Sequence, residues 1–275
     1  MVRTWPGPDR LQQLSGNTFM ADTHALPPLY VEPVALNSTL HASWRLKEGD
    51  AAFAARLPFI QLVLAELVQA SRSFPILFDG EGGWPLALLG LEKHVNLFVQ
   101  EGRWDADFHV PAYIRRYPFV FISTADESRY VLGIDRASDR LVTNDQEGAP
   151  LFENGAPSEL TRQALRFCNT YHAEASATNA FCAALKDQDL LVDRQGSITL
   201  ADGRALALQG FKVVDPARLE KLDDAVLVDW HRNGWMAAIY AHIASLDFQR
   251  LLRRASKHAI AANQSSPMPA ETVSA

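Results

Sequence analysis

The 275-residue chain lacks several features that define common protein classes. It has two cysteines, Cys168 and Cys182, which excludes a scaffold held by disulfides and any zinc site made of cysteines alone. Both lie among apolar residues in segments with a helical pattern, so we interpret them as buried structural thiols. No apolar run approaches the roughly 20 residues of a membrane-spanning helix, and the longest, residues 85–91, has the length of a strand. No membrane span is therefore expected.

The chain also lacks an excess of basic residues and an apolar signal sequence. Lys and Arg number 26 against 32 Asp and Glu, a net charge of −6. Neither half of the chain is basic, which argues against a nucleic-acid partner. The first residues show no apolar core of a signal peptide, so we expect the cytoplasm. Met20 is an alternative to Met1 as the natural start of the chain, because the residues before it show no hydrophobic periodicity.

Proline is scarce in the second part of the chain. Twelve of the 15 prolines lie between Pro6 and Pro157, and Pro216 is the only one within residues 158–266. Because proline interrupts helices and central strands, the first part is predicted to form short, mainly antiparallel strands with one helix. The rest is predicted to be mostly helical and packed against it, which makes an α+β fold. We expect a flexible arm at 1–28, a single domain at 29–254 and a disordered tail at 255–275.

Local patterns indicate where the elements lie. The one early helix is expected at residues 59–70, where apolar residues recur at helical spacing. Strands are expected at residues 29–34, 40–46, 75–78, 86–91, 95–99, 118–122 and 130–134, and a hairpin at 198–208 around Asp202-Gly203. Helices are expected after Ser158, Thr178, Asp215 and Asp223 or Asp224, and over 235–254. In the last of these, His242 shares a face with apolar residues, so we interpret it as a core histidine.

The most unusual segment, residues 96–121, combines aromatic residues with adjacent arginines. Our candidate binding residues are Trp104, His109, Tyr113, Arg115, Arg116 and Tyr117. Arginines beside aromatic rings are typical of surfaces that bind anions or peptides, because the guanidinium group makes paired hydrogen bonds and stacks on rings. Alternatively, the rings fill the core and the arginines form internal salt bridges. We expect residues 112–117 to form a strand, whose adjacent arginines would point to opposite faces, so at most one could serve a given pocket.

A metal site is a weaker possibility. On a strand, Asp107 and His109 would share a face, and His94 or another histidine could complete the site of a non-haem iron oxygenase. Their order, Asp-x-His, reverses the usual His-x-Asp, and otherwise Asp107 lies on the surface and His109 packs among rings. Glycine-rich phosphate loops and the G-x-S-x-G motif are absent. We therefore predict no cofactor, with the metal site as the alternative.

Blocks along the chain resemble the SapC family of bacterial proteins. They include FPILF at 74–78, LLGL at 88–91, VPAYIRRYPF at 110–119, LQGF at 208–211 and HIASL at 242–246. Together the matching blocks span about residues 30–252, and one departure is His109, where the family usually has tyrosine. The resemblance implies a link to bacterial surface-layer or outer-membrane and uptake systems, and it brings no known catalytic residues.

Two functions are compatible with these observations. The favoured one is a non-catalytic accessory protein that binds a peptide or protein partner through the Trp104–Phe119 segment. The alternative is a metal-dependent enzyme, of the cupin or non-haem iron oxygenase type, that modifies a peptide or amino acid. The identity of the ligand and the oligomeric state stay open.

Overall fold

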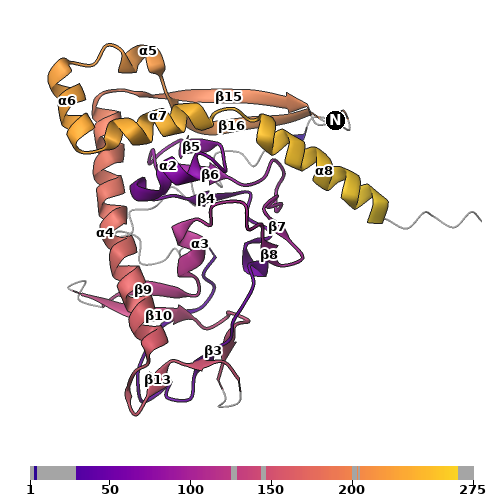
Figure 1. Cartoon of the computed structure of the whole chain (residues 1–275), viewed down its shortest axis with the longest axis vertical. Coiled ribbons are helices and arrows are strands. Elements are labelled where there is room, and N and C mark those ends of the chain that lie inside the picture. Colours follow the sequence, from indigo (N-terminus) through magenta and orange to yellow (C-terminus); the bar gives the residue numbers. More distant parts are fainter. Residues whose placement is uncertain are drawn as a thin grey trace, which may run out of the picture.

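The largest sheet lies at one end of the molecule, at the top of Figure 1. The structure is a computed structural model that describes residues 3–4, 29–124, 129–143, 147–199, 203 and 205–265. The sheet has the order β1–β16–β5–β6–β4, and β15 also pairs with β16. Its pairs are antiparallel except that of β1 with β16. The strands are β1 (Arg3–Thr4), β4 (Phe59–Gln61), β5 (Ile76–Asp79), β6 (Pro85–Leu88), β15 (Leu191–Thr199) and β16 (Ala205–Val214).

Several smaller sheets make up the opposite end of the molecule. Strands β2, β10 and β9 form one, β11, β3 and β12 form another, and β13–β14 and β7–β8 are two-stranded. Their bounds are β2 (Pro33–Ala35), β3 (Arg45–Leu46), β7 (Val99–Gln100), β8 (Arg103–Trp104), β9 (Phe119–Ser123), β10 (Tyr130–Asp135), β11 (Leu141–Val142), β12 (Ala149–Pro150), β13 (Phe152–Glu153) and β14 (Ala156–Pro157).

One long helix joins these two ends, and most of the others lie near the large sheet (Figure 1). The helices are η1 (Ala52–Ala54), η2 (Leu64–Glu66), α2 (Leu67–Ala70), α3 (Ala112–Arg116), α4 (Glu159–Asp187), α5 (Pro216–Leu219), α6 (Asp224–Arg232), α7 (Trp235–Ser245) and α8 (Gln249–Ser265). Helix α4 runs along one side of the molecule, from the small sheets to the large one (Figure 1). This is the predicted α+β fold, with short strands first and a helical C-terminal part.

Helix α4 shows one cap that was predicted correctly and one that was wrong. The Ser158 side chain accepts a hydrogen bond from the amide of Thr161, as an N-cap does. Thr178 was expected to begin a second helix, but α4 continues through it. The Thr178 hydroxyl donates to the Glu174 carbonyl and accepts from the Leu64 amide at 2.8 Å. The threonine therefore joins α4 to the start of η2.

The predicted secondary structure was wrong for two segments of the chain. Residues 59–70 form β4, η2 and α2 rather than one helix, because Phe59–Gln61 complete the edge of the large sheet beside β6. Residues 112–116 form helix α3 rather than a strand. Pro111 precedes the first helical residue, where the helix needs no hydrogen bond from its amide, so the missing proton costs nothing. Tyr117 is extended, because a residue before proline favours an extended backbone over a helical one. Two prolines that were interpreted as the limits of a strand thus limit a helix.

The termini also differ from the prediction in part. Residues 235–254 form two helices, α7 and α8, with a break at 246–248. Helix α8 continues to Ser265, so the expected start of a disordered tail at 255 falls inside a helix. Arg3 and Thr4 of the predicted arm form β1, and the rest of the arm, 5–28, and residues 266–275 lie outside the described residues. Strands β15 and β16 form the predicted hairpin, although they are longer than expected, and Asp202 of the expected turn lies outside the described residues. The Asp215 cap is as predicted.

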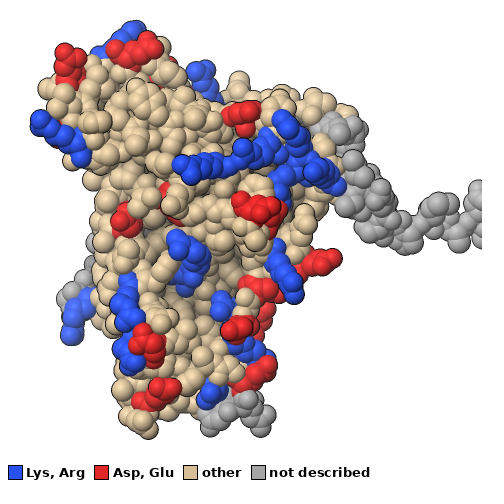
Figure 2. Space-filling model, in the orientation of Figure 1, with Lys and Arg blue, Asp and Glu red and all other residues tan. Residues whose placement is uncertain are grey.

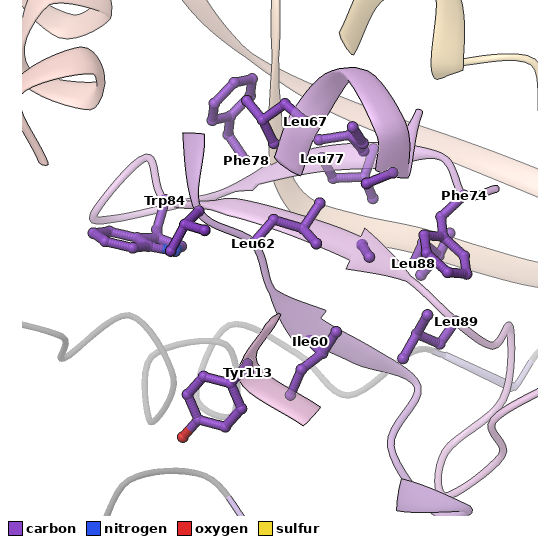
Figure 3. Close-up of a cluster of buried hydrophobic side chains, with 14 of the residues drawn as sticks. Ile60, Leu62, Leu67, Phe74, Leu77, Phe78, Trp84, Leu88, Leu89 and Tyr113 are labelled. Atoms are coloured by element: carbon purple, nitrogen blue, oxygen red, sulfur yellow. The ribbon is translucent and has the colours of Figure 1, made fainter. Parts of the chain in front are cut away.

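The hydrophobic core has a large cluster around the main sheet and a small one beneath α4. Figure 3 shows part of the large cluster, in which Leu62, Phe78 and Leu89 lie around β4–β6, and Tyr113 of α3 borders it. The small cluster packs β3, β9 and β10 against the first turns of α4. Cys168 and Cys182 are buried, as predicted, and burial raises their pKa values to about 11 and about 12. Such thiols are unreactive at neutral pH.

His242 is the core histidine that the sequence predicts. Its Nε2 accepts from the Val214 amide at 3.1 Å, so Nδ1 carries the proton and donates to the Ile76 carbonyl at 3.0 Å. The imidazole therefore joins α7 to β16 and β5. Burial lowers the pKa of His242 from 6.5 to about 4, because charge is unfavourable in an apolar surrounding.

Protonation of His242 should destabilise the fold in mild acid. Between pH 6.5 and about 4 the unfolded chain binds a proton at this histidine and the folded chain does not. The neutral imidazole of His242 therefore contributes about 3 kcal/mol to the free energy of unfolding. This contribution is complete above pH 6.5 and is lost as the pH falls toward 4. Urea unfolding across this range should show a steeper loss of stability for the wild type than for His242→Gln. A parallel loss in both proteins would contradict the assignment, and His231→Gln, at an exposed histidine, is the control.

Candidate functional site

Helix α3 begins at a buried carboxylate. Glu66, at the end of η2, is 5% exposed, and its Oε1 accepts from the Val63 amide at 3.0 Å. Its Oε2 accepts from the amide of Ala112, the first residue of α3, at 2.8 Å. The Nε2 of His109 lies 2.8 Å from the same oxygen and donates to it, since a carboxylate can only accept. Glu66 thus fixes both the start of α3 and the segment that leads into it.

At its other end, α3 carries a buried arginine among tyrosines. The guanidinium group of Arg116 lies 4.6 Å from the ring centroid of Tyr113 and 4.4 Å from that of Tyr171. Its Nε donates to the hydroxyl of Tyr30 at 3.2 Å, and that hydroxyl donates to the Phe119 carbonyl at 2.6 Å. Burial raises the pKa of Tyr30 to about 12 and also raises the pKa values of Tyr113 and Tyr171 well above that of a free tyrosine, so the rings stay neutral around the cation. These are cation–π contacts in a desolvated setting, where they are strongest.

Arg115 lies on a different side of the helix. Successive helical residues are rotated by about 100°, so Arg115 is exposed where Arg116 is buried. Its Nε donates to the Val110 carbonyl at 3.1 Å, and its guanidinium group lies 5.3 Å from the ring centroid of Phe167 on α4. Of the two adjacent arginines, Arg115 is the one exposed to solvent.

Arg115 borders an open pocket of about 290 Å³ between α3, β8 and the loop that contains η1. Figure 2 shows basic side chains around a hollow in the corresponding part of this face. The lining residues are Gly49, Asp50, Ala51, Phe53, Arg103, Trp104, Val110, Ile114, Arg115, Tyr117 and Arg140. They include three arginines, three aromatic rings and a single carboxylate.

The walls of this pocket are fixed by a backbone hydrogen bond and by Asp135, which is a second buried acid besides Glu66. The Ala51 amide donates to the carbonyl of Gly102, which has a φ of 77° in the β7–β8 turn, and a Cβ there would lie 2.6 Å from Asp50. Tyr117 donates to the fully buried Asp135 at 3.3 Å, and its ring stacks on that of Phe53. These contacts hold the aromatic floor of the pocket in one position.

The candidate residues separate into three groups. Trp104, Arg115 and Tyr117 meet at the pocket. Tyr113 and Arg116 lie in the core, and His109 is held by Glu66. Phe53, Arg103 and Arg140 were not predicted. Arg103 directly precedes the candidate Trp104, whereas nothing in the sequence connects Arg140 to α3.

The predicted metal ligands do not converge. Asp107 and His94 are exposed, and His109 is bonded to Glu66. Across the described parts of the chain, no group of three or more His, Cys, Asp or Glu side chains is placed to hold a metal ion. Asp107 and His109 were expected on one strand, but the segment between β8 and α3 is not a strand.

Comparison with known proteins identifies the family. The SapC family matches residues 36–251, most of the chain, and the protein belongs to this family. No curated protein and no solved structure matches it. The match covers the pocket and the whole of α3. Within the described residues, none of the helices combines the length and apolar character that crossing a membrane requires.

The two adjacent arginines should differ sharply on substitution. Arg116→Ala removes a desolvated cation from three rings and leaves a cavity, so we expect a loss of about 3 kcal/mol or more in the free energy of unfolding. Arg115→Ala, at an exposed side chain, should cost under about 1 kcal/mol. Urea denaturation of both variants measures the difference, and equal losses would contradict the placement of α3.

Proposed function

We propose that this protein is a non-catalytic accessory protein that binds a peptide or protein partner. The contact site is the pocket between α3, β8 and residues 49–53. The observation that carries the proposal is the meeting of Arg103, Arg115 and Arg140 with aromatic rings in one open pocket. The SapC resemblance adds the expected link to bacterial surface-layer or outer-membrane systems. The cytoplasmic location stays a prediction.

The chemistry of the lining favours a carboxylate as the bound group. Guanidinium groups make paired, charge-assisted hydrogen bonds to carboxylates, and they stack on rings. Arg140 is held in place, since its Nε donates to the Lys47 carbonyl at 3.3 Å and its Nη1 to the Tyr117 carbonyl at 3.4 Å. Trp104 and Phe53 offer apolar area beside the charges. An acidic side chain or a C-terminal carboxylate of a partner fits this combination.

The same lining supports binding rather than acid–base catalysis. Arginine keeps its proton at all physiological pH values and so cannot act as a general base. Among the described residues of the lining, Asp50 is the one carboxylate, and histidine, cysteine, serine and lysine do not occur. Asp50 accepts from the Ala52 amide at 2.9 Å, so it has a local role in the loop.

The size of the pocket also suits one or two side chains of a partner. Sites for drug-sized ligands and cofactors occupy about 300–1,000 Å³, and this pocket, at about 290 Å³, lies at the lower end of that range. A larger partner would place a single anchoring residue in it and use the surrounding surface for the remaining contacts.

Selection from a random peptide library displayed on phage tests the proposal. Peptides selected on the immobilised protein should be enriched in acidic residues or should depend on a free C-terminal carboxylate. Arg115→Ala should weaken their binding about tenfold or more, because a paired charged hydrogen bond is lost, and should leave the fold intact. Arg166→Ala, at an exposed arginine on α4, is the matched control and should bind normally.

Two outcomes would overturn the proposal. One is that no peptide is enriched, or that Arg115→Ala binds the enriched peptides as tightly as the wild type. The other is that mass spectrometry detects a covalent change in a selected peptide after incubation with the protein. That change would favour the enzyme alternative.

A further inference from the structure

Helix α8 carries a stripe of basic residues. Between Gln249 and Ser265 the sequence contains four Lys or Arg residues and no Asp or Glu, in a chain whose net charge is −6. The basic residues are Arg250, Arg253, Arg254 and Lys257. Their spacing of three, one and three residues places all four on one face of the helix. Figure 2 shows basic side chains gathered over α8, on the same face as the hollow beside α3.

Two members of this basic stripe attach α8 to the body of the protein. Arg254 donates to the Leu97 carbonyl at 2.9 Å and to Asp105 at 2.8 Å. Its guanidinium group lies 4.6 Å from the ring centroid of Phe98 and 4.5 Å from that of Phe108. Arg250 donates to the Arg72 carbonyl. Buried Leu251 completes the attachment from the adjacent helix face. The position of the stripe is therefore fixed.

The other two members are exposed and line a groove. Arg253 and Lys257 are exposed, and the groove beside them has a volume of about 360 Å³. It is lined by Phe108, Asp247, Gln249, Arg250, Arg253, Arg254 and Lys257. The carboxylate of Asp247 already accepts from the Gln249 amide at 3.0 Å. Four cations therefore line this groove beside the one acid Asp247, and of the four only Arg254 is described in an ion pair, with Asp105.

We propose that this groove binds an acidic, extended segment of a partner protein. Residues four apart on a helix are separated by about 6 Å along its axis, which applies to the exposed pair Arg253 and Lys257. Alternate side chains of an extended chain repeat at about 6.7 Å. Acidic residues at every second position can therefore reach successive cations of the stripe. The inference rests on the proposed function, because it names the chemistry of the partner and adds a second contact region.

The observations favour a peptide over other polyanions. A bilayer presents a broad surface to its ligands, whereas these cations line a hollow. Nucleic acid is repelled by the chain as a whole, whose net charge is −6, and its binding depends on wide basic surfaces. A narrow acidic segment meets the stripe without bringing a second large anionic surface close to the protein.

Fluorescence anisotropy with a labelled peptide of ten glutamates tests the inference on the full chain at low salt. The wild type should bind it, and added salt should weaken binding. The double variant Arg253→Glu/Lys257→Glu should bind on the order of tenfold or more weakly, since both exposed cations are replaced by repulsive carboxylates. The matched control is Lys221→Glu/Arg232→Glu, at exposed residues near α6, which is far from α8 in Figure 1. This control should bind as the wild type does.

The arms of the experiment separate this inference from the proposed function. Arg115→Ala should retain most of its binding to decaglutamate and lose binding to peptides selected on the pocket. If Arg115→Ala does not weaken binding of the selected peptides while the α8 variant loses binding to decaglutamate, the proposed function is removed and the basic groove at α8 stands. The inference is overturned if decaglutamate does not bind the wild type, or binds both double variants equally. It is also overturned if phosphatidylglycerol vesicles or a 20-base DNA bind more tightly than decaglutamate and lose binding in the α8 variant.

Discussion

The position of helix α3 depends on two buried charged side chains. At its start, the carboxylate of Glu66 accepts the amide of Ala112 and the ring of His109. At its end, the guanidinium group of Arg116 is enclosed by the rings of Tyr30, Tyr113 and Tyr171. A five-residue helix has little stability of its own, so these contacts hold it in place. Each charge is hydrogen-bonded or stacked, which offsets its cost of burial.

This anchoring explains how adjacent arginines acquire different roles. With Arg116 inside, helical rotation directs Arg115 outward, and the pocket forms where α3 faces Trp104 and Arg103. A similar arrangement occurs at α8, where Arg254 packs against two rings and is hydrogen-bonded while Arg253 is exposed. In both helices an arginine packed on rings fixes the element, and its neighbour is exposed to solvent. Both exposed arginines border hollows rich in positive charge, which agrees with a partner that carries acidic residues.

The sequence predicted the α+β class, the family, the buried cysteines and His242, because composition, motifs and apolar periodicity carry that information. The prediction of a strand at residues 112–117 was wrong, because Pro111 and Pro118 are compatible with either a short helix or a strand between them. The predicted cap at Thr178 was also wrong, since a polar residue between helical patterns resembles a cap, and only the tertiary contact with Leu64 shows its role. Of the six candidate binding residues, Trp104, Arg115 and Tyr117 line the pocket. Arg140 could not be predicted, because it approaches Tyr117 through a long-range contact that no local pattern encodes.

The central claim is that Glu66 holds the start of α3 and thereby the orientation of both arginines. Hydrogen exchange over residues 109–117, measured by mass spectrometry for the wild type and for Glu66→Gln, tests it most directly. The glutamine amide group can replace only part of the carboxylate's acceptors, so protection in this segment should fall on the order of tenfold or more. Protection of the β15–β16 hairpin should remain unchanged. Equal protection of residues 109–117 in the two proteins would contradict the account.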